Sequence, residues 1–144
     1  MTDLLRYWTP EFAEHYVSAL NADAPFQKIA RKFDDTIVLV CLGTPDGKDV
    51  SQALHIRKGR VTQDLVVEDA PSAFRSAPFD KKSMMARTTT TYEVWCKLDR
   101  GEMNVVQALA SPEHKIEGSK LKIAKALPVL NGLSAVASGL DKKY

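Results

Sequence analysis

The side chains that could carry chemistry do not form a recognisable catalytic or metal-binding arrangement. Asp99 and Glu102 flank an expected helix end, where solvated carboxylates are normal, and nothing places them across a cleft as an acid–base pair. His114-x-x-Glu117 has no second ligand pair nearby, so it does not predict a zinc site. The sequence holds no G-x-S-x-G, P-loop or G-x-G-x-x-G motif. We therefore expect no catalytic residue, no metal and no cofactor, and we interpret the histidines as surface or hydrogen-bonded residues: His15, His55 and His114.

The two cysteines lie far apart and form no CxxC motif. Cys41 falls within an expected buried strand and is interpreted as inert. Cys96 follows Trp95 on an expected helix with basic neighbours, where a lowered thiol pKa is the less favoured alternative. Two free thiols in a cytoplasmic protein are expected, and a single structural disulfide is the less favoured alternative.

Length and charge place the chain among ordinary single-domain proteins. Its 144 residues predict one domain, 1–144, with 44% hydrophobic and 26% charged residues. The 20 basic residues are interleaved with 18 acidic ones, and a net charge of +2 does not indicate a nucleic-acid partner. No apolar run approaches the ~20 residues that span a membrane, and the N-terminal MTDLLRYW lacks the apolar core of a signal peptide. The last residues, 141–144, are not a peroxisomal address.

Two helices are expected before residue 34. Thr9 is a suitable N-cap before Pro10, and Phe12, Tyr16 and Leu20 then recur at a spacing of four. Asp23 can cap a second helix, whose core-facing positions are expected at i, i+3, i+4 and i+7: Phe26, Ile29, Ala30 and Phe33.

The middle of the chain predicts a sheet. Residues 36–42 are apolar on both faces, which is typical of a central or doubly covered strand. Strands at 50–57 and 61–67 complete a meander through the loop 58–60. Residues 69–83 are expected to form a crossing loop with a helical turn, followed by a fourth strand at 84–91.

The stretch 92–127 predicts helix, stop, short helix, strand, turn and helix. Tyr92, Trp95 and Leu98 share one helical face, and Gly101 can supply a left-handed stop. Asn104 can cap a short helix with an apolar face at 105, 106, 109 and 110. A fifth strand is expected at 114–117, a tight turn with positive φ at Gly118, and a cap at Ser119. The last helix has Leu121, Ala124 and Leu127 on one face until Pro128 kinks or breaks it, and an apolar stripe then continues to Leu140.

This order of residues resembles the C-terminal half of the sterol carrier protein family. The resemblance is carried by Trp95, Leu98, Gly101, Asn104, Ala108-Leu109, Ile116 and Gly118-Ser119, and it covers about residues 10–135. The family often has Asp where this chain has Asn104 and Ser119. Both replacements still cap helices, so the departure bears on ligand identity and not on the fold.

The resemblance implies an α+β fold with N-terminal helices and a five-stranded, mainly antiparallel sheet covered by helices. It also implies an apolar tunnel between sheet and helices, closed by the C-terminal segment 129–140 as a lid over a cavity bounded by Phe33, Trp95, Leu109 and Leu127. From composition alone, the large apolar side chains favour an ordinary core over a cavity lining. The expected ligand-binding residues are Phe12, Tyr16, Phe33, Leu39, Leu54, Met84, Trp95, Leu98, Val106, Leu109, Ile116, Leu127, Leu130 and Leu133.

The resemblance favours non-enzymatic binding or carriage of a fatty acid, an acyl chain or a sterol-like lipid. Tyr16, Trp95 and His55 are the candidate polar contacts for its head group, although the favoured interpretation is that each side chain is already hydrogen-bonded within the protein. The alternative is a protein-interaction or substrate-presenting module that acts with a separate enzyme. Transient contact with a membrane surface and a homodimer are compatible with either reading.

Overall fold

The computed structural model describes residues 4–144, the side chain of Val105 apart, and shows a five-stranded sheet. The spatial order is β3-β2-β1-β4-β5, in which β1 and β4 are parallel and all other neighbours are antiparallel. The predicted α+β fold with a mainly antiparallel sheet is therefore confirmed. The strands are β1 (Asp34–Leu42), β2 (Lys48–Arg57), β3 (Arg60–Asp69), β4 (Ala86–Thr91) and β5 (Lys115–Gly118).

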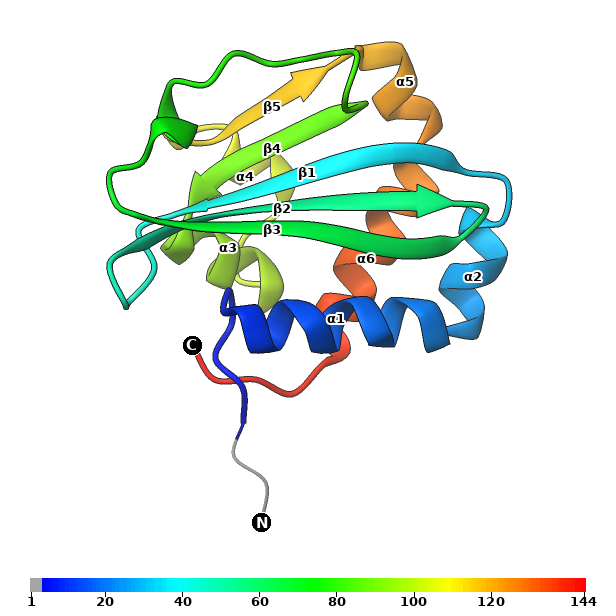
Figure 1. The fold of residues 1–144 in the computed structure, drawn as a ribbon, viewed down its shortest axis with the longest axis horizontal. Helices are drawn as coiled ribbons and strands as arrows, with labels where there is room; N and C mark the ends of the chain where they lie inside the picture. The colour runs from blue at the N-terminus through cyan, green and yellow to red at the C-terminus, as the bar shows by residue number, and fades with distance from the viewer. Residues whose placement is uncertain (1–3) are drawn as a thin grey trace.

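The α-helices gather on one face of this sheet; in the view of Figure 1 some lie behind the strands and others below and beside them. They are α1 (Pro10–Ala22), α2 (Ala24–Ala30), α3 (Tyr92–Asp99), α4 (Val105–Ala108), α5 (Lys120–Lys125) and α6 (Leu127–Gly139). A 3-10 turn, η1 (Ala73–Arg75), lies in the connection from β3 to β4. None of the helices within residues 4–144 is both long and apolar enough to cross a bilayer.

Local capping explains where several helices begin. Thr9 Oγ1 accepts from the Phe12 amide, and Asp23 Oδ2 accepts from the Phe26 amide at 2.9 Å. Asn104 and Gln107 form a reciprocal capping box at 2.8 and 2.9 Å. Ser119 caps α5 as predicted, and Gly101 ends α3 with φ at 73°.

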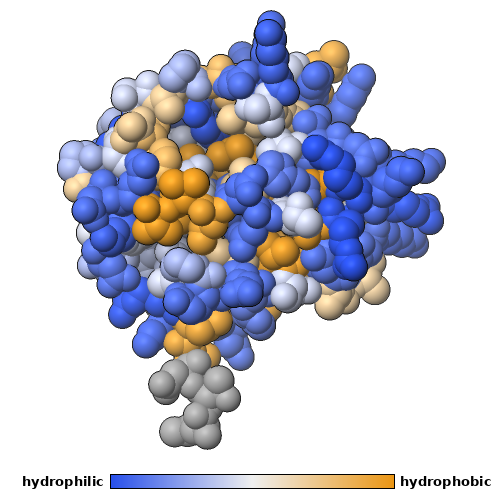
Figure 2. All heavy atoms as spheres, viewed as in Figure 1, coloured by the Kyte–Doolittle hydropathy of each residue, from blue (hydrophilic) through white to orange (hydrophobic). Residues whose placement is uncertain are grey.

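The sheet buries apolar residues on both faces, as the pattern of β1 predicts. Ile37 and Cys41 face the helices, whereas Val38, Val40 and Leu42 join a second cluster on the opposite face. This opposite face is the one seen in Figure 2, where hydrophobic residues emerge at the centre among hydrophilic ones. The crossing segment covers part of it with Phe74 and Met84.

One buried carboxylate anchors that crossing segment. Asp49 is fully buried, and its Oδ2 accepts from the amide and hydroxyl of Ser72 and from Arg75 Nε at 2.9 Å. Burial by itself would raise the pKa of Asp49, but the hydrogen bonds from Arg75 and Ser72 outweigh it and hold the pKa well below its usual range. The carboxylate therefore stays charged, and η1 is fixed over the outer face.

Some expected core positions are wrong. Ile29 is 45% exposed and Leu121 65% exposed, because each lies on the outer side of a short helix. The break in the last helical region comes at Ala126, before the predicted position, and Pro128 lies in the first turn of α6. A proline is tolerated there since the first-turn amides have no helical acceptor.

We expect Gly118→Ala to lower the free energy of unfolding by more than about 2 kcal/mol. Gly118 has φ of +136°, and an added Cβ would lie 2.5 Å from the Met85 carbonyl oxygen. The matched control is Gly101→Ala, which has φ of +73° but nothing within 4 Å of the new Cβ, and should cost only about 1–2 kcal/mol of backbone strain. Urea denaturation measures both, and equal losses would contradict the steric argument.

Candidate ligand-binding cavity

A cavity of about 490 Å³ lies between the inner face of the sheet and helices α1, α3 and α6. The centre of its floor is one row of residues that are cross-strand partners from β3 to β5, with Ile37, Val50 and Ala86 of the neighbouring rows beside it. The inward alternation of each strand places this row on the helix side of the sheet. The row consists of Leu65, Gln52, Leu39, Thr88 and Ile116.

Nine of the expected ligand-binding residues line this cavity. They come from α1, β1, α3, β5 and α6, so the structure brings together residues that are up to 121 positions apart, Phe12 and Leu133 being the extremes. That they contact a ligand stays a prediction. The nine are Phe12, Tyr16, Leu39, Trp95, Leu98, Ile116, Leu127, Leu130 and Leu133.

The other five expected residues lie elsewhere. Leu54 is fully buried within the core, Phe33 packs at its margin, and Met84 packs on the opposite face of the sheet. Val106 and Leu109 are 77% and 56% exposed, since α4 has only four residues and contacts the core through Ala108. The expected boundary of the cavity is therefore wrong at Phe33 and Leu109, while Trp95 and Leu127 do line it.

Sequence reasoning missed several lining residues. Gln52 could have been inferred, because it lies two residues from both Val50 and Leu54 and therefore shares the inward face of β2 with them. Tyr7 and Trp8 precede the first periodic segment, and no pattern places them. Together with α1 they form an aromatic wall, in which Trp8 lies 5.2 Å from Trp95 and Tyr7 lies 5.3 Å from Phe12, measured between ring centroids.

The expected head-group contacts are already engaged within the protein. The Tyr16 hydroxyl donates to the Leu133 carbonyl at 2.7 Å, and Trp95 Nε1 donates to the Val40 carbonyl at 3.0 Å. His55 lies on the other face of the sheet, where its ring contacts Thr36 and Asp64. These bonds orient the cavity wall, and they leave the three side chains with little capacity for a ligand.

A buried ion pair closes one end of the cavity. Lys142 Nζ donates to Asp99 Oδ2 at 2.6 Å and to the Ala137 carbonyl at 2.7 Å, with both side chains at most 3% exposed. The ammonium also lies 5.2 Å from the Tyr7 ring centroid and 5.5 Å from that of Phe12. The expectation that Asp99 is solvated is wrong, because the C-terminal tail folds back over the end of α3.

His114 is the unusual polar residue of the lining. It is 8% exposed, and neither ring nitrogen has a hydrogen-bond partner among the described residues. Burial lowers its pKa below the ordinary histidine value, so the ring is neutral at neutral pH. The expectation of a surface or hydrogen-bonded histidine is wrong for His114, whereas it holds for His55.

The two thiols and the metal-ligating side chains are the remaining groups that could take part in chemistry. Cys41 and Cys96 are both free and buried, and burial raises the pKa of each thiol. Within residues 4–144, no group of three or more metal-ligating side chains comes together.

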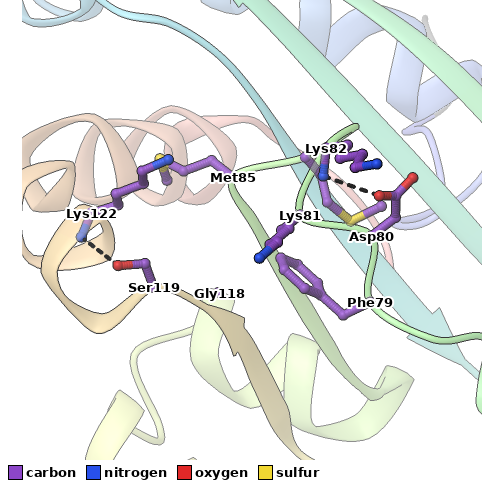
Figure 3. Close-up of a pocket in the computed structure, with 9 residues that line it drawn as sticks. Phe79, Asp80, Lys81, Lys82, Met85, Gly118, Ser119 and Lys122 are labelled. Carbon is purple, nitrogen blue, oxygen red and sulfur yellow. Dashed lines mark hydrogen bonds between the residues drawn. The ribbon is translucent and has the colours of Figure 1, made fainter.

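A second hollow of about 630 Å³ lies between the crossing segment and the start of α5. Figure 3 shows that Phe79 and Lys81 extend from the crossing segment on one side, while Ser119 and Lys122 lie at the start of α5 on the other. Its lining includes four charged side chains, Asp80, Lys81, Lys82 and Lys122. This hollow does not suit an apolar ligand, and the internal cavity is the better candidate site.

Comparison with solved structures agrees with this arrangement. A conserved hypothetical protein from Thermus thermophilus, described as possibly a sterol carrier protein, superposes with a TM-score of 0.69 at 15% identity, over 99% of this chain and 94% of that one. Sterol carrier protein 2 superposes with a TM-score of 0.68 at 16% identity, over 94% of this chain and all of that one. The chain has the sterol carrier protein fold.

The same fold occurs within a larger enzyme. A sec-alkyl sulfatase matches 86% of this chain with 16% of its own length, at a TM-score of 0.52 and 18% identity. No family model and no curated protein matches the sequence. At these identities the likeness establishes the fold alone.

We expect Lys142→Met to destabilise the protein by roughly 3–5 kcal/mol, because it leaves the Asp99 carboxylate buried without its partner. The double variant Asp99→Leu/Lys142→Met should recover part of that loss, since no charge then remains buried. Urea denaturation of the two single variants and the double variant provides the coupling energy. Simple additivity would show that the pair is not coupled in solution.

Proposed function

We propose that this protein binds an apolar small molecule, a fatty acid, an acyl chain or a sterol-like lipid, in the cavity beneath α6 and carries it without chemical change. The supporting observation is the cavity itself. Its volume falls in the ~300–1,000 Å³ range of small-molecule sites, and its lining is largely aliphatic and aromatic. The likeness to sterol carrier protein 2 in fold agrees with this assignment.

Four exposed residues of the lining indicate where a ligand could enter the cavity. Leu127, Asn131 and Ser134 of α6 and Asn104 of the α3–α4 loop all line the cavity and are exposed. We infer that a ligand enters between these two segments. In this proposal α6 is the lid implied by the family resemblance, held by the bond from Tyr16 to the Leu133 carbonyl.

A carrier is favoured over an enzyme by the state of the side chains that could react. The Asp99 carboxylate is already ion-paired with Lys142, and both thiols are buried with a raised pKa. No observation within residues 4–144 specifically favours the interaction-module alternative. The two free thiols support a reducing compartment such as the cytoplasm.

The function is tested by blocking the cavity. Leu39 lies at the centre of the floor, so Leu39→Trp should weaken binding of a fluorescent fatty-acid analogue by about tenfold or more. The control is Leu121→Trp, which adds the same ring at a position 65% exposed and outside the cavity. Saturable binding to the wild type that survives Leu39→Trp would place the ligand elsewhere. No saturable binding of a fatty acid, sterol or acyl chain to the wild type would defeat the proposal.

We further propose that ligand exchange involves transient contact with an anionic membrane. Leu121 and Leu127 are exposed beside a cluster of lysines at the α5 end of the molecule, so apolar insertion and charge attraction act on one surface. The lysines are Lys120, Lys122 and Lys125.

Leu121→Asp should therefore reduce co-sedimentation with phosphatidylserine-containing vesicles several-fold. Val66→Asp is the control, since Val66 is 46% exposed on β3, away from the lysine cluster. Equal loss in both variants, or no vesicle binding by the wild type, would contradict membrane contact while leaving ligand binding untouched.

A further inference from the structure

The cavity lining contains buried polar atoms that have no hydrogen-bond partner among the described residues. Buried polar groups in proteins are nearly always hydrogen-bonded, because leaving one unpaired costs roughly 1–3 kcal/mol. Among the residues that line the cavity, His114 and Trp8 Nε1 are buried without a partner in the described chain. The ring of His114 is the more informative, since a neutral imidazole offers one donor and one acceptor.

A second unpaired group lies beside His114 in the sheet. The β4–β5 register pairs Thr89 with Lys115, so its continuation by one residue brings His114 opposite Thr90. Thr90 is fully buried, and its hydroxyl also has no partner within residues 4–144. Two unpaired polar side chains therefore lie on neighbouring strands where β4 leads into α3, and His114 is the one of the two that lines the cavity.

The charges around the cavity restrict what can bind there. No lysine or arginine lies in the described lining, and Asp99 is its one carboxylate. The ammonium of Lys142 is already bonded to Asp99 and to a backbone carbonyl. A carboxylate ligand would thus enter beside an anion with no free cation, and an unpaired buried charge is strongly unfavourable.

We propose that His114 receives the polar end of the ligand and that this end is an uncharged hydroxyl group, as in a long-chain alcohol or a sterol. A hydroxyl both donates and accepts, so it matches the two unused atoms of the neutral imidazole. The apolar body of the ligand then lies over the floor row of the sheet. This inference rests on the proposed carrier function and narrows its ligand class.

The test uses three ligands that differ only in the head group: dodecanol, dodecanoate and dodecane. Each displaces an uncharged fluorescent apolar probe, such as Nile red, from the full chain at mildly alkaline pH. We expect the wild type to bind dodecanol about tenfold or more tightly than dodecanoate, and about three- to tenfold more tightly than dodecane. His114→Phe should lower dodecanol affinity to that of dodecane, whereas His114→Gln, which keeps a donor and an acceptor, should retain most of the preference.

His15→Phe is the matched control, since His15 is exposed on α1 and outside the cavity, and it should leave all three affinities unchanged. Imidazole ¹⁵N shifts of His114 should move on addition of dodecanol but not of dodecane, which separates direct contact from a fold defect. Dodecanoate binding as tightly as dodecanol, or a preference that survives His114→Phe, would overturn the inference while the carrier function stands. Failure of all three ligands to bind would instead defeat the carrier function itself.

Discussion

The buried pair of Asp99 and Lys142 is the interaction on which the cavity depends. It ties the end of α3 to the tail that follows the last helix. The tail in turn pairs with the N-terminal segment, because the backbone amide of Tyr7 donates to the Lys143 carbonyl and the backbone amide of Lys143 donates to the Leu5 carbonyl, both at 2.9 Å. Three segments remote in sequence thereby form one wall. The aromatic residues before α1 pack within this wall, Tyr7 against Phe12 and Tyr144, and Trp8 against Trp95.

The floor of the cavity follows from a different constraint. A sheet must present one residue per strand in each cross-strand row, and here one such row holds two leucines, an isoleucine, a glutamine and a threonine. The rows on either side are buried: Ile37 and Leu54 in one row and Cys41 and Val50 in the other are at most 2% exposed. The cavity thus lies over one row of a regular sheet that the helices leave uncovered, and it needs no unusual backbone in the strands.

Local signals in the sequence were sufficient for most of the fold. Caps such as Asn104, the positive φ at Gly118 and the alternation of β1 each depend on a few neighbouring residues, so they could be predicted. The contact of Asp99 with Lys142 joins residues 43 positions apart, and no local pattern encodes it. Short helices misled the prediction in the opposite way, because α4 is only four residues long and leaves Val106 and the following Leu109 exposed.

The position of the two indole rings has a spectroscopic consequence. The chain has two tryptophans, and both Trp8 and Trp95 line the cavity with their centroids 5.2 Å apart. Light absorbed selectively by indole is therefore emitted entirely from the cavity wall, and the rings are near enough to share excitation energy. Any molecule that enters changes the polarity around both emitters at once, so the unlabelled protein carries its own optical reporter of occupancy.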